Sequence, residues 1–229
     1  MSNPLVFDIE TAPLPEEQIA NLIPPFDPAE VKVGNIKDPA LIQEKIKKAE
    51  EKHRSDFIQK AALNPDTGRV IAIGFKWAEG WHMVSTSHPS AEKQVIETFW
   101  EEYRRASSGE AFREMIGHNI IDFDLPFLIQ RSWHLGIAIP PRAFTFSRNG
   151  KYLAYAENFI DTRLMFQLGR KEARSSLDAV SRFFGMEGKS ETGKEFYLWL
   201  EEDPEKAKEY LRKDLDLTWG IAEKMGVIR

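Results

Sequence analysis

Two acidic residues interrupt an apolar run near the N-terminus, Leu5–Thr11, which reads LVFDIET. The run predicts a buried β-strand. Because residues i and i+2 point to the same face of a strand, Asp8 and Glu10 are expected to project together. Two carboxylates on one face of a buried strand repel each other and lose hydration unless a cation lies between them. The pair therefore indicates a site for Mg²⁺ or Mn²⁺, which prefer oxygen ligands, and the alternative is a strand end with two solvated acids.

A third acid lies between a strand and a helix in the middle of the chain. Asp124 follows a strand expected to end at Met115–Asn119, and it precedes a helix expected from Pro126. An isolated aspartate at this position is usually the N-cap of the helix. Asp122 is the competing acid in this stretch, and we interpret it as a loop residue.

The fourth acid lies on the last predicted helix, Pro204–Met225. Its apolar stripe includes Asp214, and Tyr210 lies one turn earlier on the same face. A carboxylate that faces a core needs a partner. Asp216, in contrast, points away from the stripe and is expected in water.

Composition limits the classes of protein that this chain can represent. Its 229 residues, of which 42% are hydrophobic and 29% charged, fit a soluble globular domain. The sequence has no cysteine, its five histidines are scattered, and its net charge is −5, which argues against a zinc site and against a uniformly basic nucleic-acid binder. No apolar stretch of membrane-spanning length and no signal peptide is visible, so we expect a cytoplasmic protein without membrane contact.

One segment is basic within this acidic chain. The window 131–174 holds eight bases and three acids, a local charge of +5 that leaves −10 for the remainder. Asn149–Gly150 predicts a hairpin turn within Phe144–Leu153, where aromatic residues alternate with Arg148 and Lys151. Such mixtures bind single-stranded nucleic acid, although a solvated surface is the simpler alternative.

The remaining pattern predicts an α/β domain with one long insertion. Residues of about 12–65 are rich in proline and then helix-permissive, which indicates a peripheral arm. The other expected elements are a helix over 40–62, paired strands at Arg69–Trp77 and Trp81–Thr86, a helix at Ser90–Ala106 with Ser90 as its N-cap, and a helix at Ser176–Phe184 that ends at Gly185.

These residues carry a resemblance to a known family. Asp8-Ile9-Glu10-Thr11, then His118-Asn119 leading to Phe123-Asp124, then Tyr210-x-x-x-Asp214, resemble the three motifs of DEDD-superfamily 3′–5′ exonucleases of the tyrosine type. The residues of the first two motifs are most similar to those of stand-alone exonucleases related to family B DNA polymerases. His118-x-x-x-Asp122 has the spacing of the histidine type. It lies within the second motif, in the wrong order along the chain, so we interpret it as coincidence.

The resemblance implies a ribonuclease H-like α/β fold, with a mixed central β-sheet flanked by helices, in a single domain over 1–229. It implies 3′→5′ hydrolysis of phosphodiester bonds with release of nucleoside 5′-monophosphates and two Mg²⁺ or Mn²⁺ ions. Asp8 would bridge both ions, Glu10 and Asp214 would complete the first site, and Asp124 would hold the second largely through water. Tyr210 would orient the attacking water, since a phenol with a pKa near 10 is a poor base.

Substrate and partner assignments are less specific. Thr11, Asn119 and Phe123 are candidate substrate contacts, each with a structural alternative, while His118 and Asp161 are interpreted as structural. The expected substrate is single-stranded nucleic acid, DNA in preference to RNA. The expected context is proofreading or DNA repair, with a DNA polymerase or repair assembly acting in trans. The alternatives are a catalytically weak binding module, an exoribonuclease, or another ribonuclease H-like nuclease.

Overall fold

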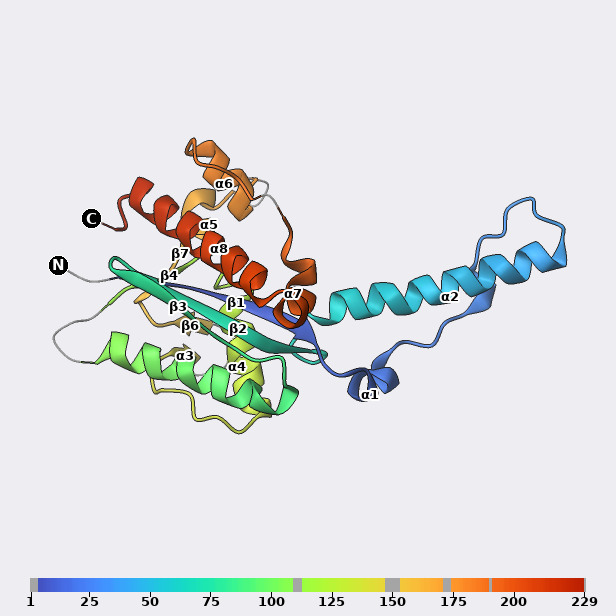
Figure 1. Ribbon diagram of the computed structural model, residues 1–229, viewed down its shortest axis with the longest axis horizontal. Coiled ribbons are helices and arrows are strands. Elements are labelled where there is room, and N and C mark those ends of the chain that lie inside the picture. Colours follow the sequence, from blue (N-terminus) through green and yellow to red (C-terminus); the bar gives the residue numbers. More distant parts are fainter. Residues whose placement is uncertain (1–3, 109–112, 147–152, 171–173, 190, 229) are drawn as a thin grey trace. The chain divides into compact units, whose positions relative to one another are not determined.

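A five-stranded sheet in the order β3-β2-β1-β4-β7 is the centre of the fold (Figure 1). In that order its strands are Gly80–Ser85, Gly68–Trp77, Leu5–Pro13, Met115–Gly117 and Phe159–Asp161. β2 and β3 are antiparallel, whereas β1 is parallel to β4 and β4 is parallel to β7. The expected mixed sheet is therefore confirmed. Because the parallel strands end at one edge, the residues that follow β4 and β7 gather beside the C-terminal half of β1.

The computed structural model describes residues 4–108, 113–146, 153–170, 174–189 and 191–228. The chain forms two compact units, one made of Met1–Thr11 with Val70–Arg229 and the other made of Ala12–Arg69. None of the helices in the described ranges is long and apolar enough to cross a membrane.

Side chains alternate along β1 between two cores. Phe7 and Ile9 belong to a large buried cluster with residues of α3 (Glu92–Ser107) and α4 (Asp124–His134). Val6 instead packs with Leu215 of α8 (Pro204–Lys224), on the opposite face. Figure 1 shows α8 and α3 on opposite sides of the sheet. The alternation places the even-numbered residues of β1 on the α8 face.

The rest of the first unit consists of short elements. Two of them, β5 (Phe144–Phe146) and β6 (Leu153–Tyr155), pair antiparallel with Phe144 opposite Tyr155, as the predicted hairpin requires. Its turn, with Asn149 and Gly150, lies outside the described residues. The other elements are η3 (Pro89–Ala91), α5 (Thr162–Gln167), α6 (Leu177–Phe183), η4 (Gly193–Glu195) and α7 (Phe196–Glu202).

The second unit contains α1 (Glu16–Ile19), η1 (Ala20–Leu22), η2 (Pro28–Glu30) and the long helix α2 (Pro39–Ala61). Its prolines begin helices as well as interrupting regular structure. Asp27 and Asp38 accept hydrogen bonds from the backbone N–H groups of Ala29 and Ala40, at 2.8 and 2.9 Å, which caps η2 and α2. Proline is tolerated in the first turn because its missing N–H would have no helical partner there.

Two predicted helix starts are wrong. Ser90 is not the N-cap of α3: it lies within η3, its hydroxyl is 2.8 Å from Nδ1 of His88, and α3 begins at Glu92. Likewise α4 begins at Asp124, two residues before Pro126. In both places the proline occupies the first turn of a helical segment, so it marks a start only to within a few residues.

Candidate active site

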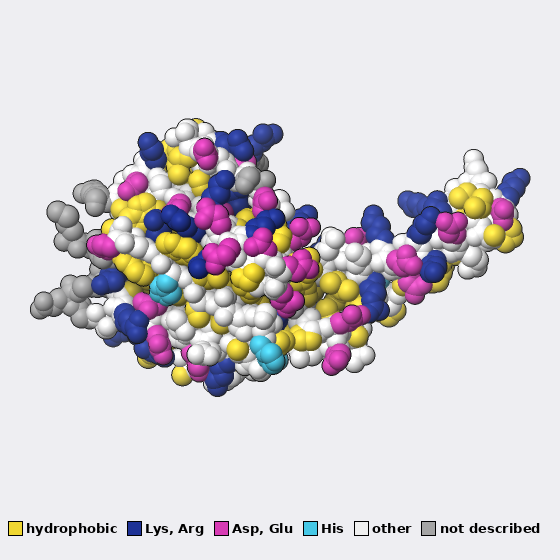
Figure 2. Space-filling model, viewed as in Figure 1, with side chains coloured by type: hydrophobic (Ala, Val, Ile, Leu, Met, Phe, Trp, Pro, Cys, Tyr) yellow, Lys and Arg dark blue, Asp and Glu magenta, His cyan; other side chains and the backbone are white. Residues whose placement is uncertain are grey.

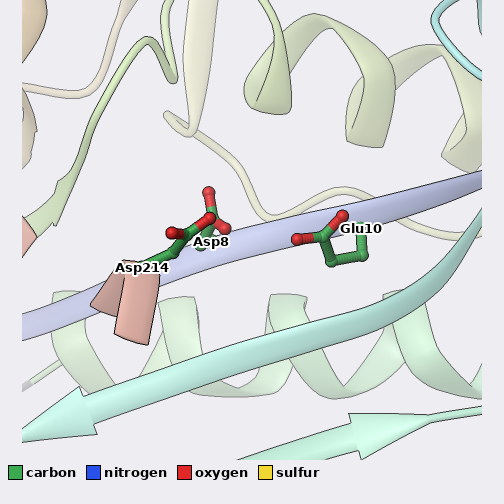
Figure 3. A group of neighbouring side chains, drawn as sticks. All are labelled: Asp8, Glu10 and Asp214. Carbon is green, nitrogen blue, oxygen red and sulfur yellow. The ribbon is translucent and has the colours of Figure 1, made fainter. Parts of the chain in front are cut away.

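Three of the four predicted acids form one cluster on the α8 face of the sheet. Asp8 and Glu10 project from β1, and Asp214 reaches them from α8 (Figure 3). Each contributes a carboxylate oxygen, and these oxygens all lie within 4.8 Å of one another. Asp214 is buried, and Asp8 and Glu10 are half-buried. Asp216 is instead partly exposed and forms an ion pair of 3.0 Å with Lys76.

Crowding changes the acidity of this cluster. Burial, and then the charge of Asp214, raise the pKa of Asp8 from 3.8 to about 7. Burial and the charge of Asp8 raise the pKa of Glu10 well above its usual value. Burial also raises the pKa of Asp214, although Lys189 opposes the increase. The positive charge near the cluster is therefore too small to offset the repulsion of three acids, and crowded carboxylate oxygens of this kind fit a divalent ion such as Mg²⁺ or Mn²⁺.

Asp124 lies next to this cluster without joining it. It is buried at the start of α4, and its Oδ1 accepts a hydrogen bond of 3.2 Å from the backbone N–H of Ile9, between the two acids of β1. Burial, and then the charge of Asp8, raise its pKa well above the usual value. Asp124 is thus the first helical residue and not the N-cap, and it is bonded to the strand that carries the cluster.

Tyr210 lies one turn before Asp214 on α8, and its hydroxyl donates a hydrogen bond to the Asp214 carboxylate. Burial and the charges of the neighbouring acids raise the pKa of this phenol far above 10. The ring contacts Trp199 of α7, with 5.5 Å between the ring centroids. Gly193 of η4 is so close that a Cβ there would lie 2.9 Å from Oη. Tyr210 is therefore a hydrogen-bond donor held close to the acids, and its raised pKa makes it a poor base.

Lys189 is a residue of the site that sequence reasoning missed. Its ammonium donates to Oδ2 of Asp214 and lies 4.9 Å from the centroid of the Tyr210 ring. Its backbone N–H donates to Asp178 at 2.9 Å, which ties this segment to α6. The charge of Lys189 lowers the pKa of Asp8, Glu10 and Asp214, so the lysine partly offsets their repulsion.

This arrangement predicts a pH-dependent effect of Lys189→Met. Without the ammonium, the pKa values of the neighbouring acids should rise further, and protons should compete more strongly with metal ions. We expect Mn²⁺ affinity to fall about 10-fold at pH 6.5 and to match or exceed that of the wild type at pH 8.5. Titration calorimetry at both pH values measures this, with the exposed Lys194→Met as control. An equal loss at both pH values would contradict it.

Asp161, interpreted from the sequence as structural, holds the loop that leads to Asp124. Its two carboxylate oxygens accept hydrogen bonds of 3.0 Å from the backbone N–H groups of Asn119 and Ile121. The same side chain caps α5 by accepting from Arg163 and Leu164. One buried carboxylate thus joins the ends of β4 and β7.

We therefore expect Asp161→Ala to destabilise the protein by about 2–4 kcal/mol, because it leaves several backbone donors without their acceptor. Activity should fall at least about 10-fold, since a displaced loop misplaces Asp124 by distances that matter for catalysis. Thermal unfolding and rate measurements check this. Asp122→Ala, in the same loop but exposed, is the control and should change neither.

The candidate substrate contacts are placed unevenly. Thr11 follows Glu10 on β1 and is half-buried. Asn119 has a left-handed backbone (φ 74°), and its side-chain oxygen accepts a hydrogen bond from Arg163. Phe123 is partly buried, with its ring centroid 5.7 Å from that of Phe127. These three assignments stay predictions. Arg148 and Lys151 lie outside the described residues.

One member of the basic window does not belong to the surface. Arg131 is only 3% exposed and pairs with the buried Glu92, with 2.7 Å between Nη2 and Oε2. Glu92 also accepts a hydrogen bond of 2.9 Å from the backbone N–H of Val70. The local charge of +5 counted over this window therefore includes one base, Arg131, that is buried and neutralised by Glu92. The helical spacing of Arg131 from Phe127 and Leu128, both on the buried face of α4, is the signal that could have shown it.

The mixed sheet therefore has carboxylates on its central strand and on the helix that covers it, as the resemblance found in the sequence implies. The chain belongs to the family of predicted 3′–5′ exonucleases related to the exonuclease domain of PolB, whose model matches residues 55–228. No curated protein matches it.

A solved structure with the same fold is the family B DNA polymerase from the hyperthermophilic archaeon Pyrobaculum calidifontis, with a TM-score of 0.58 and 19% identity. The similarity covers 98% of this chain but only 24% of the polymerase. The chain thus spans about a quarter of that enzyme's length, and the likeness at this identity concerns the fold.

Proposed function

We propose that this chain removes nucleoside 5′-monophosphates from the 3′ end of single-stranded nucleic acid, DNA in preference to RNA, with two divalent ions. The observation that carries the proposal is the cluster of Asp8, Glu10 and Asp214, whose oxygens lie within 4.8 Å of one another beside a fixed tyrosine hydroxyl. Family membership supplies the reaction class. The two ions, the preference for single-stranded DNA and the partners are parts of the proposal that family membership does not supply.

The cluster, Asp124 and Tyr210 have separate tasks in this proposal. Asp8, Glu10 and Asp214 would hold one ion, and Asp124, beside Ile9, would hold a second through water. The bound ions would polarise the scissile phosphate and lower the pKa of the attacking water. Tyr210 would orient that water by a hydrogen bond without acting as the base, because its raised pKa keeps the phenol protonated.

One assay tests this function and its alternatives. Single-stranded DNA and RNA, labelled at either the 3′ or the 5′ end, are incubated with Mg²⁺, Mn²⁺ or EDTA. We expect stepwise shortening from the 3′ end, only with metal and faster on DNA. Preference for RNA would favour an exoribonuclease, internal cuts would favour another ribonuclease H-like nuclease, and binding without cleavage would favour a binding module.

We further propose that the β5–β6 hairpin contacts the strand. Its described part carries Phe144 and Tyr155 as an opposed pair, and the sequence places Arg148 and Lys151 in its turn. Bases stack on aromatic rings while cations follow the phosphates. We also propose a cytoplasmic location and a role in proofreading or repair beside a polymerase in trans.

The hairpin proposal predicts a change in salt dependence. Replacing Arg148 and Lys151 with alanine should weaken oligonucleotide binding and reduce the salt slope by about one unit for each lost phosphate contact. Fluorescence anisotropy at several salt concentrations measures both, and Mn²⁺ affinity should not change. Unchanged affinity and slope would leave the hairpin a purely structural element.

A further inference from the structure

Four large apolar side chains of α5, its C-cap and α6 are exposed, and none of them belongs to the acidic cluster. Leu164, Met165, Leu168 and Phe183 are 40, 41, 82 and 70% exposed, respectively. We call these four residues the α5–α6 patch. Exposed apolar residues that occur singly are ordinary, whereas a group of them marks a surface that binds something.

Ring contacts join the two helices that carry the patch. Leu164 lies one helical turn before Leu168 at the end of α5, and Met165 follows Leu164 on the adjacent side of the helix. Phe166 joins α5 to α6 because its ring centroid lies 5.1 Å from that of Phe183 in an edge-to-face contact. Phe184 contacts both rings, with centroid distances of 6.2 and 5.2 Å. These contacts fix Phe183 in place while leaving most of it exposed.

Leu168 gives the strongest indication that the patch binds a partner. It ends α5 in the left-handed region, with φ 48° and ψ 39°, where an ordinary L-residue costs about 1–2 kcal/mol and glycine or asparagine is preferred. Its side chain is almost fully exposed, so no burial within the chain offsets that cost. This leucine contributes little to folding, and its side chain is available to a partner.

Basic residues lie close to the patch in sequence. Arg170 and Arg174 are exposed, and neither forms an ion pair with another described residue. Arg182, on α6, is 61% exposed and pairs with Asp178. Over 162–186 the sequence holds five bases and two acids, a charge of +3 in a chain of −5. Figure 2 shows hydrophobic and basic side chains side by side over α6, at the top of the view.

We propose that the α5–α6 patch docks an acidic amphipathic segment of another protein. Apolar side chains of that segment would cover Leu168 and Phe183, and its carboxylates would face Arg170 and Arg174. Complementary charge around an apolar centre is the usual composition of such an interface. The proposal does not depend on nuclease activity.

Two other occupants fit the patch less well. Nucleic acid is also anionic, but its bases stack on flat rings, and three of the four patch residues are aliphatic. A second copy of the chain, paired through the same patch, would bring Arg170 and Arg174 of both copies together, because such a contact is self-complementary. The positive charge and the aliphatic side chains therefore both favour an acidic protein segment.

The test uses a labelled helical peptide of about 18 residues, with leucines at i, i+3, i+4 and i+7 and glutamates beside them. A matched peptide carries lysines in place of the glutamates. We expect the acidic peptide to bind the full chain and the basic one not to bind. Leu168→Asn should weaken binding at least about 10-fold while keeping or raising the unfolding temperature, since asparagine tolerates the left-handed region. Leu63→Asn, at another exposed leucine, is the matched control and should bind like the wild type.

Three results would overturn the proposal. The first is equal or absent binding of both peptides. The second is binding of an oligo(dT) probe that Leu168→Asn weakens, which would assign the patch to nucleic acid. The third is self-association in sedimentation experiments that the same variant abolishes, which would assign it to a second copy. Exonuclease rates on free oligonucleotides should be the same for Leu168→Asn and the wild type, so a failure of the docking proposal is distinct from a failure of the proposed function.

Discussion

Asp8→Asn and Asp214→Asn should each reduce the exonuclease rate by about 10³-fold or more, with the fold retained. Each change keeps the size of the side chain and removes one negative charge from a group whose oxygens lie within 4.8 Å of one another. Loss of either ligand should also abolish stabilisation by divalent ions, because a ligand that binds only the folded state raises the unfolding temperature. Rates with saturating Mn²⁺, together with thermal unfolding with and without Mn²⁺, measure both effects.

The same cluster determines how the stability of the metal-free protein varies with pH. The pKa of Asp8 is raised from 3.8 to about 7 in the folded state, so between these values the folded state binds more protons than the unfolded state. The free energy of unfolding of the metal-free wild type should therefore decrease as pH rises from about 4 to 7. The unfolding temperature should fall by about 2–4 °C for each kcal/mol lost. Asp8→Asn should flatten this dependence and be more stable than the wild type near pH 7.5.

Asp122→Asn is the matched control for these variants. Asp122 is also an acid and lies in the loop before Asp124. Unlike the acids of the cluster it is exposed, and its carboxylate lies 3.5 Å from Arg163. This substitution should keep the full rate and the response to Mn²⁺. Retention of a tenth of the wild-type rate by Asp8→Asn or Asp214→Asn would refute the assignment of these acids as metal ligands.

The parts of the site that the sequence predicts are those with a local periodic signal. Alternation along β1 predicts that Asp8 and Glu10 share a face, because the strand is buried and only one register satisfies both cores. The apolar stripe of α8 predicts that Asp214 and Tyr210 lie together on the buried side. The order of the three motifs then links strand, loop and helix before any contact is known.

The parts that the sequence does not predict depend on contacts between distant residues. Lys189 reaches Asp214 from a segment without regular structure, and nothing in its neighbourhood distinguishes it from the other lysines. Arg131 and Glu92 are charged, so composition assigns them to the surface, yet each is buried by the other. The structural role of Asp161 is predicted, but its hydrogen bonds to a loop about forty residues away in sequence are not.

Tyr210→Phe should slow the reaction by roughly 10–10³-fold, the range for loss of one positioned catalytic donor, and so less than loss of a metal ligand. Burial and the neighbouring acids raise the pKa of Tyr210 far above 10, so the phenol does not titrate in the working range. The variant should therefore keep the shape of the wild-type pH–rate profile and its Mn²⁺ affinity. A profile that loses its dependence on pH in the variant would instead identify Tyr210 as the base.

Gly193→Ala tests the same role without removing the hydroxyl. A Cβ at this position would lie 2.9 Å from Oη of Tyr210 and 3.4 Å from Oε2 of Glu10, so the phenol has to shift. We expect the rate to fall towards that of Tyr210→Phe, and the two changes to be non-additive when combined, because both remove one positioned hydrogen bond. Gly80→Ala, whose Cβ would lie 3.7 Å from Trp77 in an ordinary contact, should keep the full rate. Additive losses in the double variant would show that Gly193 acts on something other than the tyrosine.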